Sequence, residues 1–313
     1  MRTLAVSADG PDAWKSWRDA FARVAPDLST VPWFDPVFDS READYALVWE
    51  PPPGEMARMG HMRAIFCAGA GVNHLVSRPD FPANVALVRM GGDQTAVLMA
   101  DYVMWAAIGL LRDAKSWTRQ QAQHVWQRRP VFRNSADTRI GILGFGNLGA
   151  AVARRLAAAG FNVSAWCRSP REEKQIPLFF GKEGLSNFLP SIDILVNLLP
   201  STPQTRHLID ADLFSRLKPG TGFINVGRGD HVVEKDLFAA LDAGRLSGAV
   251  IDVVPSEPLN AASPLWDHPR ITVTPHMASE ASRDAQAAYV AQTINELEEG
   301  RTPPLLYRPE RGY

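Results

Sequence analysis

The chain of 313 residues is longer than one hydrophobic core usually organises, which predicts two domains. Hydrophobic residues make up 46% and charged residues 21%, a composition typical of globular proteins, and the formal net charge is -1. This balance argues against nucleic acid and against a membrane surface as partners, because it offers no excess of basic residues to bind phosphate groups.

The sequence predicts neither a membrane span nor a metal site. The longest apolar stretch, residues 102–111, falls short of the roughly 20 residues that a span requires, and the N-terminal apolar run is too short for a signal peptide. Cys67 and Cys167 are too few for a disulfide framework and lack metal-ligand spacing. We therefore expect a cytoplasmic protein.

Short apolar runs alternate with helical patterns along the chain, which is typical of α/β domains with parallel sheets. In the first third the predicted strands are residues 3–7, 29–34, 44–49, 63–67 and 85–89, with a helix over 12–24. These elements predict one small α/β domain of about a hundred residues.

A second α/β series follows a long apolar helix, which we predict over residues 93–111 and which is suited to pass from one domain to the next. Residues 112–137 are polar, include Trp126 and show weak periodicity. The strands predicted after them are 139–143, 162–166, 193–197, 222–226, 248–252 and 271–274. A last helix over 282–299 ends at Gly300, a residue type that commonly terminates helices.

A glycine-rich loop lies between the strand 139–143 and an Ala-rich helix over 150–159. Its residues are Gly144, Phe145, Gly146, Asn147, Leu148 and Gly149. In a dinucleotide-binding unit the first glycine makes the tight turn, the second lets the backbone approach a pyrophosphate, and the third lets helix and strand pack closely. Because the strand, the helix and the next strand stand in the required order, we predict a dinucleotide site here.

The end of the second strand in this series indicates which dinucleotide binds. An NAD site places a carboxylate there, to hold the ribose 2′-hydroxyl. This chain instead has Arg168, Ser169 and Arg171, whose donors suit a 2′-phosphate. We predict NADP, with NADPH preferred over NADH, although the neighbouring Glu172 and Glu173 leave NAD open as the alternative.

Three later segments each place one ionisable group at a strand end, where ligands bind in such sheets. Arg228 follows the strand 222–226, Glu257 follows 248–252, and His276 follows 271–274. Reduction of a 2-oxo acid requires a cation that binds the carboxylate, an acid that protonates the carbonyl oxygen, and a group that keeps this acid protonated. The three residues match these needs in type.

With these motifs the chain resembles the D-isomer-specific 2-hydroxyacid dehydrogenases over nearly its whole length. The matching stretches are residues 45–49, 68–72, 144–149, 197–200, 228–229, 257–259, 265–269, 274–276 and 311–313. The segment around Trp49 and the terminal Arg311-Gly312-Tyr313 resemble the branch that reduces glyoxylate and hydroxypyruvate. Asn73 stands where many members carry Asp, and Gly227 where many carry Ala.

The resemblance implies a role for each site residue. His276 is implied as the general acid, Glu257 as its hydrogen-bonding partner, and Arg228 as the group that binds and polarises the substrate. Substrate binding is further implied for Trp49 and for backbone N–H groups at Ala70 and Gly71. Additional cofactor contacts are implied at Leu199, Pro200 and Asp252.

The resemblance also implies a discontinuous architecture and a homodimer. A Rossmann domain over residues 101–283 is inserted into a flavodoxin-like substrate domain of residues 1–100 plus 284–313, with the active site expected in the cleft between them. Trp126 lies in a segment that resembles the family's dimer arm. Two alternatives stay open: a reductase of larger aromatic 2-oxo acids such as phenylpyruvate, and a dinucleotide-sensing, corepressor-like binding protein. Phosphoglycerate dehydrogenase is disfavoured because a chain of this length lacks the usual regulatory extension.

Overall fold

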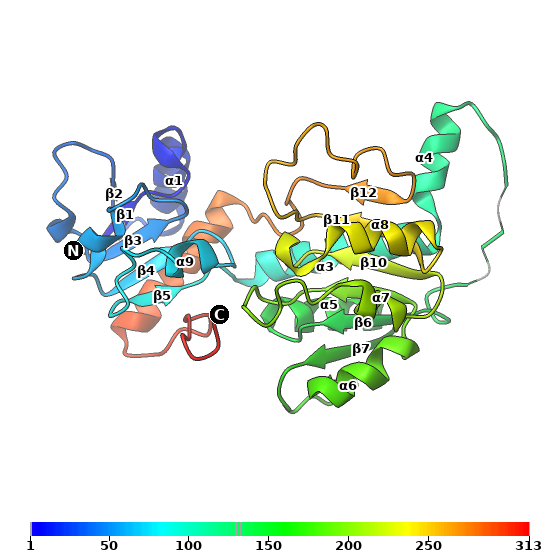
Figure 1. The fold of residues 1–313 in the computed structure, drawn as a ribbon. Coiled ribbons are helices and arrows are strands. Elements are labelled where there is room, and N and C mark those ends of the chain that lie inside the picture. The colour runs from blue at the N-terminus through cyan, green and yellow to red at the C-terminus, as the bar shows by residue number, and fades with distance from the viewer. Residues whose placement is uncertain (1, 129, 132, 313) are drawn as a thin grey trace. The chain divides into compact units, whose positions relative to one another are not determined.

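The computed structural model describes residues 2–128, 130–131 and 133–312 and divides into two compact units (Figure 1). Unit 1 comprises Met1–Gln94 and Ala281–Tyr313, and unit 2 comprises Thr95–Glu280. The boundaries predicted from the sequence lie at 100/101 and 283/284. Each unit has its own parallel sheet covered by helices, so the predicted α/β fold class is confirmed.

Unit 1 is built on five parallel strands in the order β2-β1-β3-β4-β5, which is the order of flavodoxin-like sheets. The strands are β1 (Thr3–Val6), β2 (Ser29–Pro32), β3 (Tyr45–Val48), β4 (Ala64–Cys67) and β5 (Ala86–Val88). The helices are α1 (Gly10–Val24), α2 (Asn73–Val76) and α9 (Arg283–Glu298), with short 3-10 turns η1 (Ser40–Glu42) and η2 (Met56–Met59).

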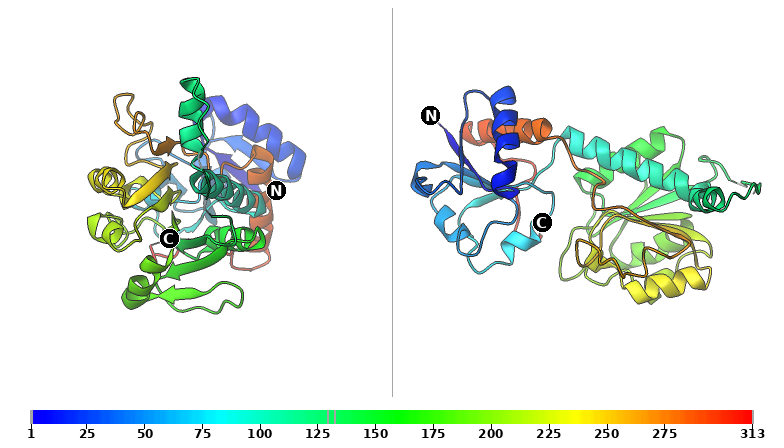
Figure 2. Two further views of the ribbon diagram at one scale, coloured as in Figure 1. Left: turned by 90° about the vertical axis from the view of Figure 1, so that its right-hand side faces the viewer. Right: turned by 90° about the horizontal axis from the view of Figure 1, so that it is seen from above.

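Both faces of this sheet are covered. On one face α1 and α9 pack side by side (Figure 2), and they bury Trp17 and Phe21 of α1 with Val290 and Ile294 of α9. The other face is covered by a cluster that includes Met59 of η2. The two ends of the chain thus share one core, although nearly 190 residues separate their segments of unit 1.

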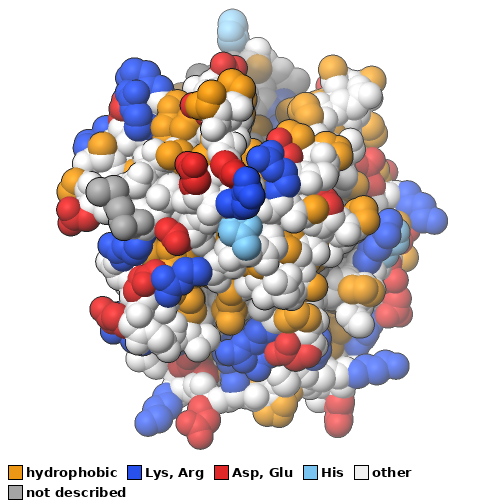
Figure 3. Space-filling model, turned by 90° about the vertical axis from the view of Figure 1, so that its left-hand side faces the viewer, with side chains coloured by type: hydrophobic (Ala, Val, Ile, Leu, Met, Phe, Trp, Pro, Cys, Tyr) orange, Lys and Arg blue, Asp and Glu red, His pale blue; other side chains and the backbone are white. Residues whose placement is uncertain are grey.

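The tail after α9 returns to the edge strand β5. The N–H of Tyr307 donates to the carbonyl of Leu87 at 2.7 Å, and the N–H of Arg89 donates to the carbonyl of Leu305 at 3.1 Å. Tyr313 of the terminal tripeptide lies outside the described residues. On the face seen in Figure 3, acidic and basic side chains are intermixed with apolar ones.

Unit 2 is built on seven parallel strands in the order β12-β11-β10-β9-β6-β7-β8. The strands are β6 (Arg139–Leu143), β7 (Asn162–Cys167), β8 (Leu178–Phe180), β9 (Ile194–Asn197), β10 (Thr221–Asn225), β11 (Leu246–Ile251) and β12 (Ile271–Val273). The helices and turns are α3 (Asp93–Leu111), α4 (Ala114–Ala122), α5 (Asn147–Ala158), α6 (Gly181–Phe188), η3 (Leu189–Ser191), α7 (Ala211–Ser215), η4 (Gly229–His231) and α8 (Glu234–Asp242). The strand order reverses at β6, which is the dinucleotide-binding arrangement of a Rossmann sheet.

Helix α3 is, by length and composition, apolar enough to cross a membrane, with a mean hydropathy of 1.4 over its best window. From the sequence no membrane span is expected, because the uninterrupted apolar stretch covers only residues 102–111, whereas the helix runs over 19 residues. Its residues Met99, Val103 and Ala107 are buried with α5 on one face of the sheet of unit 2. This burial accounts for part of the apolar sequence, because 33% of that window is buried, whereas Val97, Trp105 and Ile108 of the same helix are exposed.

The predicted strands and long helices are all present, with small shifts at their ends. Strand β8 and helix α4 are not among the elements predicted from the sequence. Strand β8 has only three residues, all half-buried, at the edge of the sheet, so its pattern is too short to detect. Helix α4 buries only Ser116 and therefore lacks the apolar stripe that would have revealed it.

Candidate active site

The glycine loop lies at the centre of the carboxyl edge of the sheet of unit 2, between β6 and α5. Gly144 has φ +99, and a Cβ there would lie 2.7 Å from the carbonyl oxygen of Leu198. A Cβ at Gly149 would overlap the backbone of Gly144, so only glycine allows this approach of helix to strand. At Gly146, the residue before α5, nothing lies within 4 Å of a Cβ. The loop thus has the tight turn, the close packing and the open helix start that a pyrophosphate requires.

The predicted phosphate-reading residues follow β7. Arg168, Ser169 and Arg171 are all exposed. The guanidinium of Arg171 donates to the carbonyl of Phe145 and lies 5.7 Å from the centre of its ring, so this side chain extends back to the glycine loop. Of the two acidic neighbours, Glu173 is nine-tenths buried and pairs with Arg154 at 2.9 Å.

Two further segments predicted to contact the cofactor are held by nearby side chains. The N–H of Leu199 donates to Asn197 Oδ1 at 3.2 Å. The carboxylate of Asp252 is buried and accepts from Thr274 Oγ1 at 2.6 Å and from the N–H groups of Met277 and Ala278 at 3.0 Å each. Asp252 therefore braces the loop that carries His276, and its predicted contact with the cofactor stays a prediction.

His276 and Glu257 are brought together from adjacent strands, β12 and β11. His276 Nδ1 lies 2.6 Å from Glu257 Oε2, and Glu257 Oε1 accepts the N–H of Val254 at 3.1 Å. His276 has φ 52, in the left-handed region, and its N–H donates to the carbonyl of Asp252 at 2.9 Å. Because the carboxylate accepts from Nδ1–H, Nε2 is the ring atom that is left for a substrate.

Arg228 follows the neighbouring strand β10. Its side-chain Nη1 donates to the carbonyl of Gly227 at 2.7 Å. A Cβ at Gly229 would overlap the backbone of Val254 and Pro255, so the Arg228 loop lies directly against the loop that leads to Glu257. The structure thus gathers the three predicted catalytic residues at the ends of β10, β11 and β12, which are consecutive in the sheet.

The predicted carboxylate-binding residues lie in unit 1, after β3 and β4. The ring of Trp49 covers Gly69, where a Cβ would overlap the indole. His74 holds Trp49 in place, since its Nε2 lies 2.8 Å from the Trp49 carbonyl oxygen and the two rings have their centres 4.3 Å apart. Among the described residues, no protein acceptor pairs with the N–H groups of Ala70 and Gly71.

Residues 104–278 match the family model described as D-isomer specific 2-hydroxyacid dehydrogenase, NAD binding domain. The chain belongs to this family. It is therefore an NAD(P)-dependent oxidoreductase with a two-domain Rossmann architecture, as the sequence resemblance implied.

Relatives of this dehydrogenase cover most of its length. Glyoxylate/hydroxypyruvate reductase A of Serratia proteamaculans is 40% identical over 271 residues, which are 85% of this chain and 86% of the relative. The reductase of the same description from Yersinia enterocolitica is 38% identical over 280 residues, 88% of this chain and 89% of the relative.

Two solved structures are similar over the whole chain, each with a TM-score of 0.91. One is a D-isomer specific 2-hydroxyacid dehydrogenase from Xanthobacter autotrophicus in complex with NADPH and MES, 35% identical and covering 100% of this chain and 99% of that one. The other is an NADPH-dependent glyoxylate/hydroxypyruvate reductase from Sinorhizobium meliloti in complex with NADP and sulfate, 33% identical and covering 100% of both chains. These neighbours support the prediction of NADP as the cofactor.

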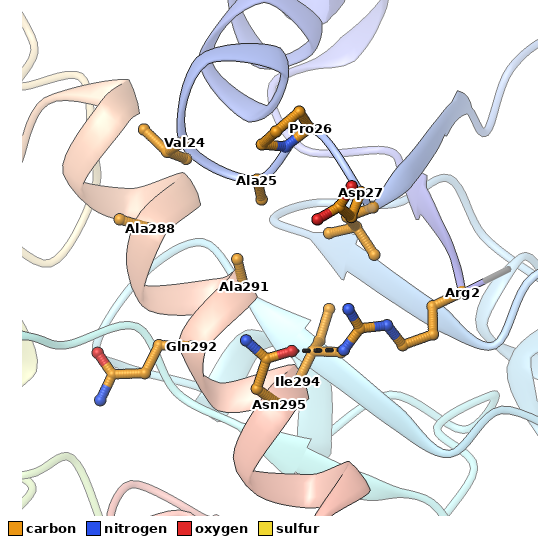
Figure 4. A pocket seen from close by; sticks show the side chains of 11 residues that line it. Arg2, Val24, Ala25, Pro26, Asp27, Ala288, Ala291, Gln292, Ile294 and Asn295 are labelled. Carbon is orange, nitrogen blue, oxygen red and sulfur yellow. Dashed lines mark hydrogen bonds between the residues drawn. The ribbon is translucent and has the colours of Figure 1, made fainter.

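Two cavities of the dehydrogenase lie away from its predicted residues. One of about 320 Å³ in unit 1 is bordered by the end of α1 and by α9, and in it the Arg2 guanidinium bonds Asn295 (Figure 4). The other, of about 410 Å³ in unit 2, is bordered by Asp193 and Lys218, which precede β9 and β10. Neither contains a residue of the predicted site.

Several side chains that hold this site are not among the residues predicted from the sequence. His74, for example, contacts Trp49 directly. Asn197 and Asn225, which end β9 and β10, and His231 were given no role. Each of these two mainly apolar strands ends in an asparagine, and a buried amide needs hydrogen-bond partners. This pattern could have indicated a polar cluster at the strand ends.

Proposed function

We propose that this dehydrogenase reduces small 2-oxo acids with NADPH: glyoxylate to glycolate and hydroxypyruvate to D-glycerate. The observation that carries the proposal is the 2.6 Å contact of His276 with Glu257 beside the Arg228 loop. An imidazole held by a carboxylate, next to a guanidinium, at the carboxyl edge of a dinucleotide-binding sheet fits reduction of a carbonyl beside a carboxylate.

The residues present fit the cofactor. The open position at Gly146 gives the pyrophosphate room at the start of α5, and the twelve-residue helix directs its first N–H groups there. Arg168, Ser169 and Arg171 would hold the 2′-phosphate. When bound, NADPH supplies the hydride that the carbonyl carbon accepts.

His276 supplies the proton. With Nδ1 occupied by Glu257, the proton that reaches the carbonyl oxygen comes from Nε2, and Glu257 stabilises the protonated ring until that transfer. Arg228 binds the carboxylate and the carbonyl oxygen and draws electron density from the carbon that accepts the hydride. One hydride and one proton convert the 2-oxo acid into the 2-hydroxy acid, and NADPH becomes NADP⁺.

Trp49 favours short substrates. Its ring covers Gly69, next to the N–H groups of Ala70 and Gly71 that would donate to the substrate carboxylate, and His74 keeps it there. An indole fixed beside the carboxylate leaves space for a hydrogen or hydroxymethyl substituent and excludes a phenyl group.

We further propose that the dehydrogenase is a cytoplasmic homodimer. Large apolar side chains are exposed on α3, on α4 and in the segment after them, with Trp105, Trp117 and Trp126 exposed by 51%, 46% and 96%. Association with a second copy would cover such side chains. Light scattering on the purified chain tests this: twice the monomer mass supports the proposal, and the monomer mass at micromolar concentration contradicts it.

Oxidation of NADPH by the purified chain tests the proposed reaction. Glyoxylate, hydroxypyruvate, pyruvate and phenylpyruvate are compared at equal concentrations, with the His276→Asn variant as the control. The proposal expects the highest specificity constants for glyoxylate and hydroxypyruvate. Higher values for phenylpyruvate would indicate a reductase of aromatic 2-oxo acids, and dinucleotide binding without turnover would indicate the corepressor-like alternative.

A further inference from the structure

A fully buried polar cluster lies directly behind Arg228. It consists of Asn197 at the end of β9, Asn225 at the end of β10, and His231 in η4, and we call it the amide–imidazole cluster. The exposed fractions of the three residues are 0%, 1% and 0%. The two asparagines are register partners in neighbouring parallel strands, so their side chains meet beneath the carboxyl edge of the sheet.

Asn197 connects the cluster to the segment that contains Leu199, a residue predicted to contact the cofactor. Its Nδ2 donates to Asn225 Oδ1 at 2.8 Å and lies 2.9 Å from His231 Nδ1, while its Oδ1 accepts the N–H of Leu199 at 3.2 Å. Both the Nδ2 and the Oδ1 atoms of the Asn197 amide therefore have partners, which fixes the orientation of the amide group.

Asn225 holds the backbone on both sides of Arg228. Its Oδ1 accepts the N–H of Gly227 at 3.3 Å, and its Nδ2 donates to the carbonyl of Arg228 at 3.2 Å. These two bonds hold the peptide group before Gly227 and the peptide group after Arg228, and so restrain the short backbone segment that carries the Arg228 side chain. A change in Asn225 alters the direction of the guanidinium without touching it.

His231 serves the cluster as a hydrogen-bond acceptor. Because Asn197 Nδ2 is a donor, His231 Nδ1 accepts, and the ring is therefore neutral with its proton on Nε2, 3.9 Å from Asp230 Oδ1. Burial lowers the pKa of His231 to about 4, with Arg228 adding to this effect and Asp230 opposing it. A charged ring would present a second donor to Asn197 and break the contact.

The cluster also accounts for Gly227. A Cβ at this position would lie 2.7 Å from Asn197 Nδ2 and 3.1 Å from His231 Nδ1. An alanine at this position would have to displace the cluster. Glycine before Arg228 thus belongs to the same arrangement.

We propose that the amide–imidazole cluster is a positioning unit that sets the direction of Arg228 for 2-oxo acid binding. The proposal rests on the proposed function, since it assigns Arg228 to the substrate. The side chain of Asn225 bonds the backbone of Arg228. His231 acts on Asn225 through Asn197, which bonds both.

The test compares His231→Leu, which removes the acceptor, with His231→Asn, whose amide oxygen can replace Nδ1. Thr221→Val is the matched control, because it removes a buried hydroxyl bonded to Lys218 at the opposite end of β10. The measurements are the KM for glyoxylate, the inhibition constant of oxamate as an unreactive substrate analogue, and the dissociation constant of NADPH. In His231→Leu we expect the KM for glyoxylate and the inhibition constant of oxamate to rise about tenfold, which corresponds to the loss of one well-directed hydrogen bond. The dissociation constant of NADPH should change less than threefold.

His231→Asn should restore both substrate constants to within about threefold of the wild type, and Thr221→Val should leave them unchanged. In an Arg228→Ala background His231→Leu should have no further effect on oxamate, because the interaction it supports is already lost. If His231→Leu does not fold by circular dichroism, Asn225→Ser carries the same expectation.

Substrate constants within twofold of the wild type in a folded His231→Leu variant, or in Asn225→Ser where His231→Leu does not fold, would overturn the proposal. An equal effect of His231→Leu on oxamate inhibition with and without Arg228 would overturn it as well, since the cluster would then act on binding independently of Arg228. Both outcomes leave an active wild type. A wild type that reduces no 2-oxo acid refutes the proposed function instead.

Discussion

Replacing Arg168 by Asp should reverse the preference between the two cofactors. Arg168 is exposed at the end of β7, where an NAD enzyme places a carboxylate. NADPH differs from NADH by one phosphate, which carries close to two negative charges at neutral pH. The substitution therefore removes an attraction for that phosphate and adds a repulsion.

The structure sets the size of the effect. Glu173, one of the two acidic residues that follow Arg168, pairs with Arg154 and accepts the N–H groups of Lys174 and Gln175, so much of its negative charge is already compensated. Loss of one charge-assisted hydrogen bond at an exposed site costs about 1.5 kcal/mol. An aspartate about 5 Å from the dianion adds about 1.5 kcal/mol in a dielectric close to that of water. The sum corresponds to roughly a hundredfold change in the ratio of specificity constants.

Steady-state rates with NADPH and NADH at saturating glyoxylate measure this ratio. We expect the wild type to prefer NADPH by at least about tenfold, and Arg168→Asp to prefer NADH, mainly through a higher KM for NADPH. Lys15→Asp, at an 81% exposed side chain on α1, makes the same change in charge and should leave the ratio unchanged. Equal use of both cofactors by the wild type, or the same ratio in the Arg168 variant, would refute the assignment.

Four further predictions concern the site and its support. His276→Asn should lower kcat by about two to four powers of ten while NADPH affinity, measured by fluorescence titration, barely changes; near-full activity would contradict its role as the acid. Glu257→Gln, which preserves an acceptor for Nδ1, should retain more activity than Glu257→Ala, and equal kcat values would show that orientation of the ring is unimportant. Trp49→Ala should raise the ratio of specificity constants for phenylpyruvate over glyoxylate by about tenfold or more, and an unchanged ratio would mean that the indole does not limit substrate size. The pKa of His231 is about 4 in the folded chain and 6.5 in the ordinary ring, so the unfolded state binds the proton first as the pH falls. The free energy of unfolding should therefore fall by about 2 kcal/mol between pH 7 and pH 5. Denaturant titrations in which His231→Asn shows the same fall would contradict this.

The sequence predicted the elements whose signals are local. Gly144, Gly146 and Gly149 indicated the nucleotide loop because a strand, a glycine turn and a helix follow each other within a few residues. Arg228, Glu257 and His276 could be expected near one another because each follows a strand of one parallel sheet. The 2.6 Å contact between His276 and Glu257 and the packing of Gly229 against Val254 needed the structure.

The supporting side chains could not be predicted because their partners are distant in sequence. His74 contacts a carbonyl 25 positions earlier, and His231 contacts an amide 34 positions earlier. Nothing in the local pattern distinguishes such residues from loop histidines. Asp252 shows the same limit: its position after β11 indicated a site residue, but its bonds to Met277 and Ala278 appear only when the strands are paired.

Transfer of deuterium tests the central claim most directly. The purified chain is incubated with glyoxylate and NADPH that carries deuterium at both C4 positions of the nicotinamide, and the products are analysed by mass spectrometry and NMR. The proposed function predicts glycolate with one deuterium at C2, formed in equal amount to NADP⁺, and a loss of this product in His276→Asn. Oxidation of NADPH with no deuterated glycolate, or unchanged formation of it by the variant, would contradict the proposed reaction or the role of His276.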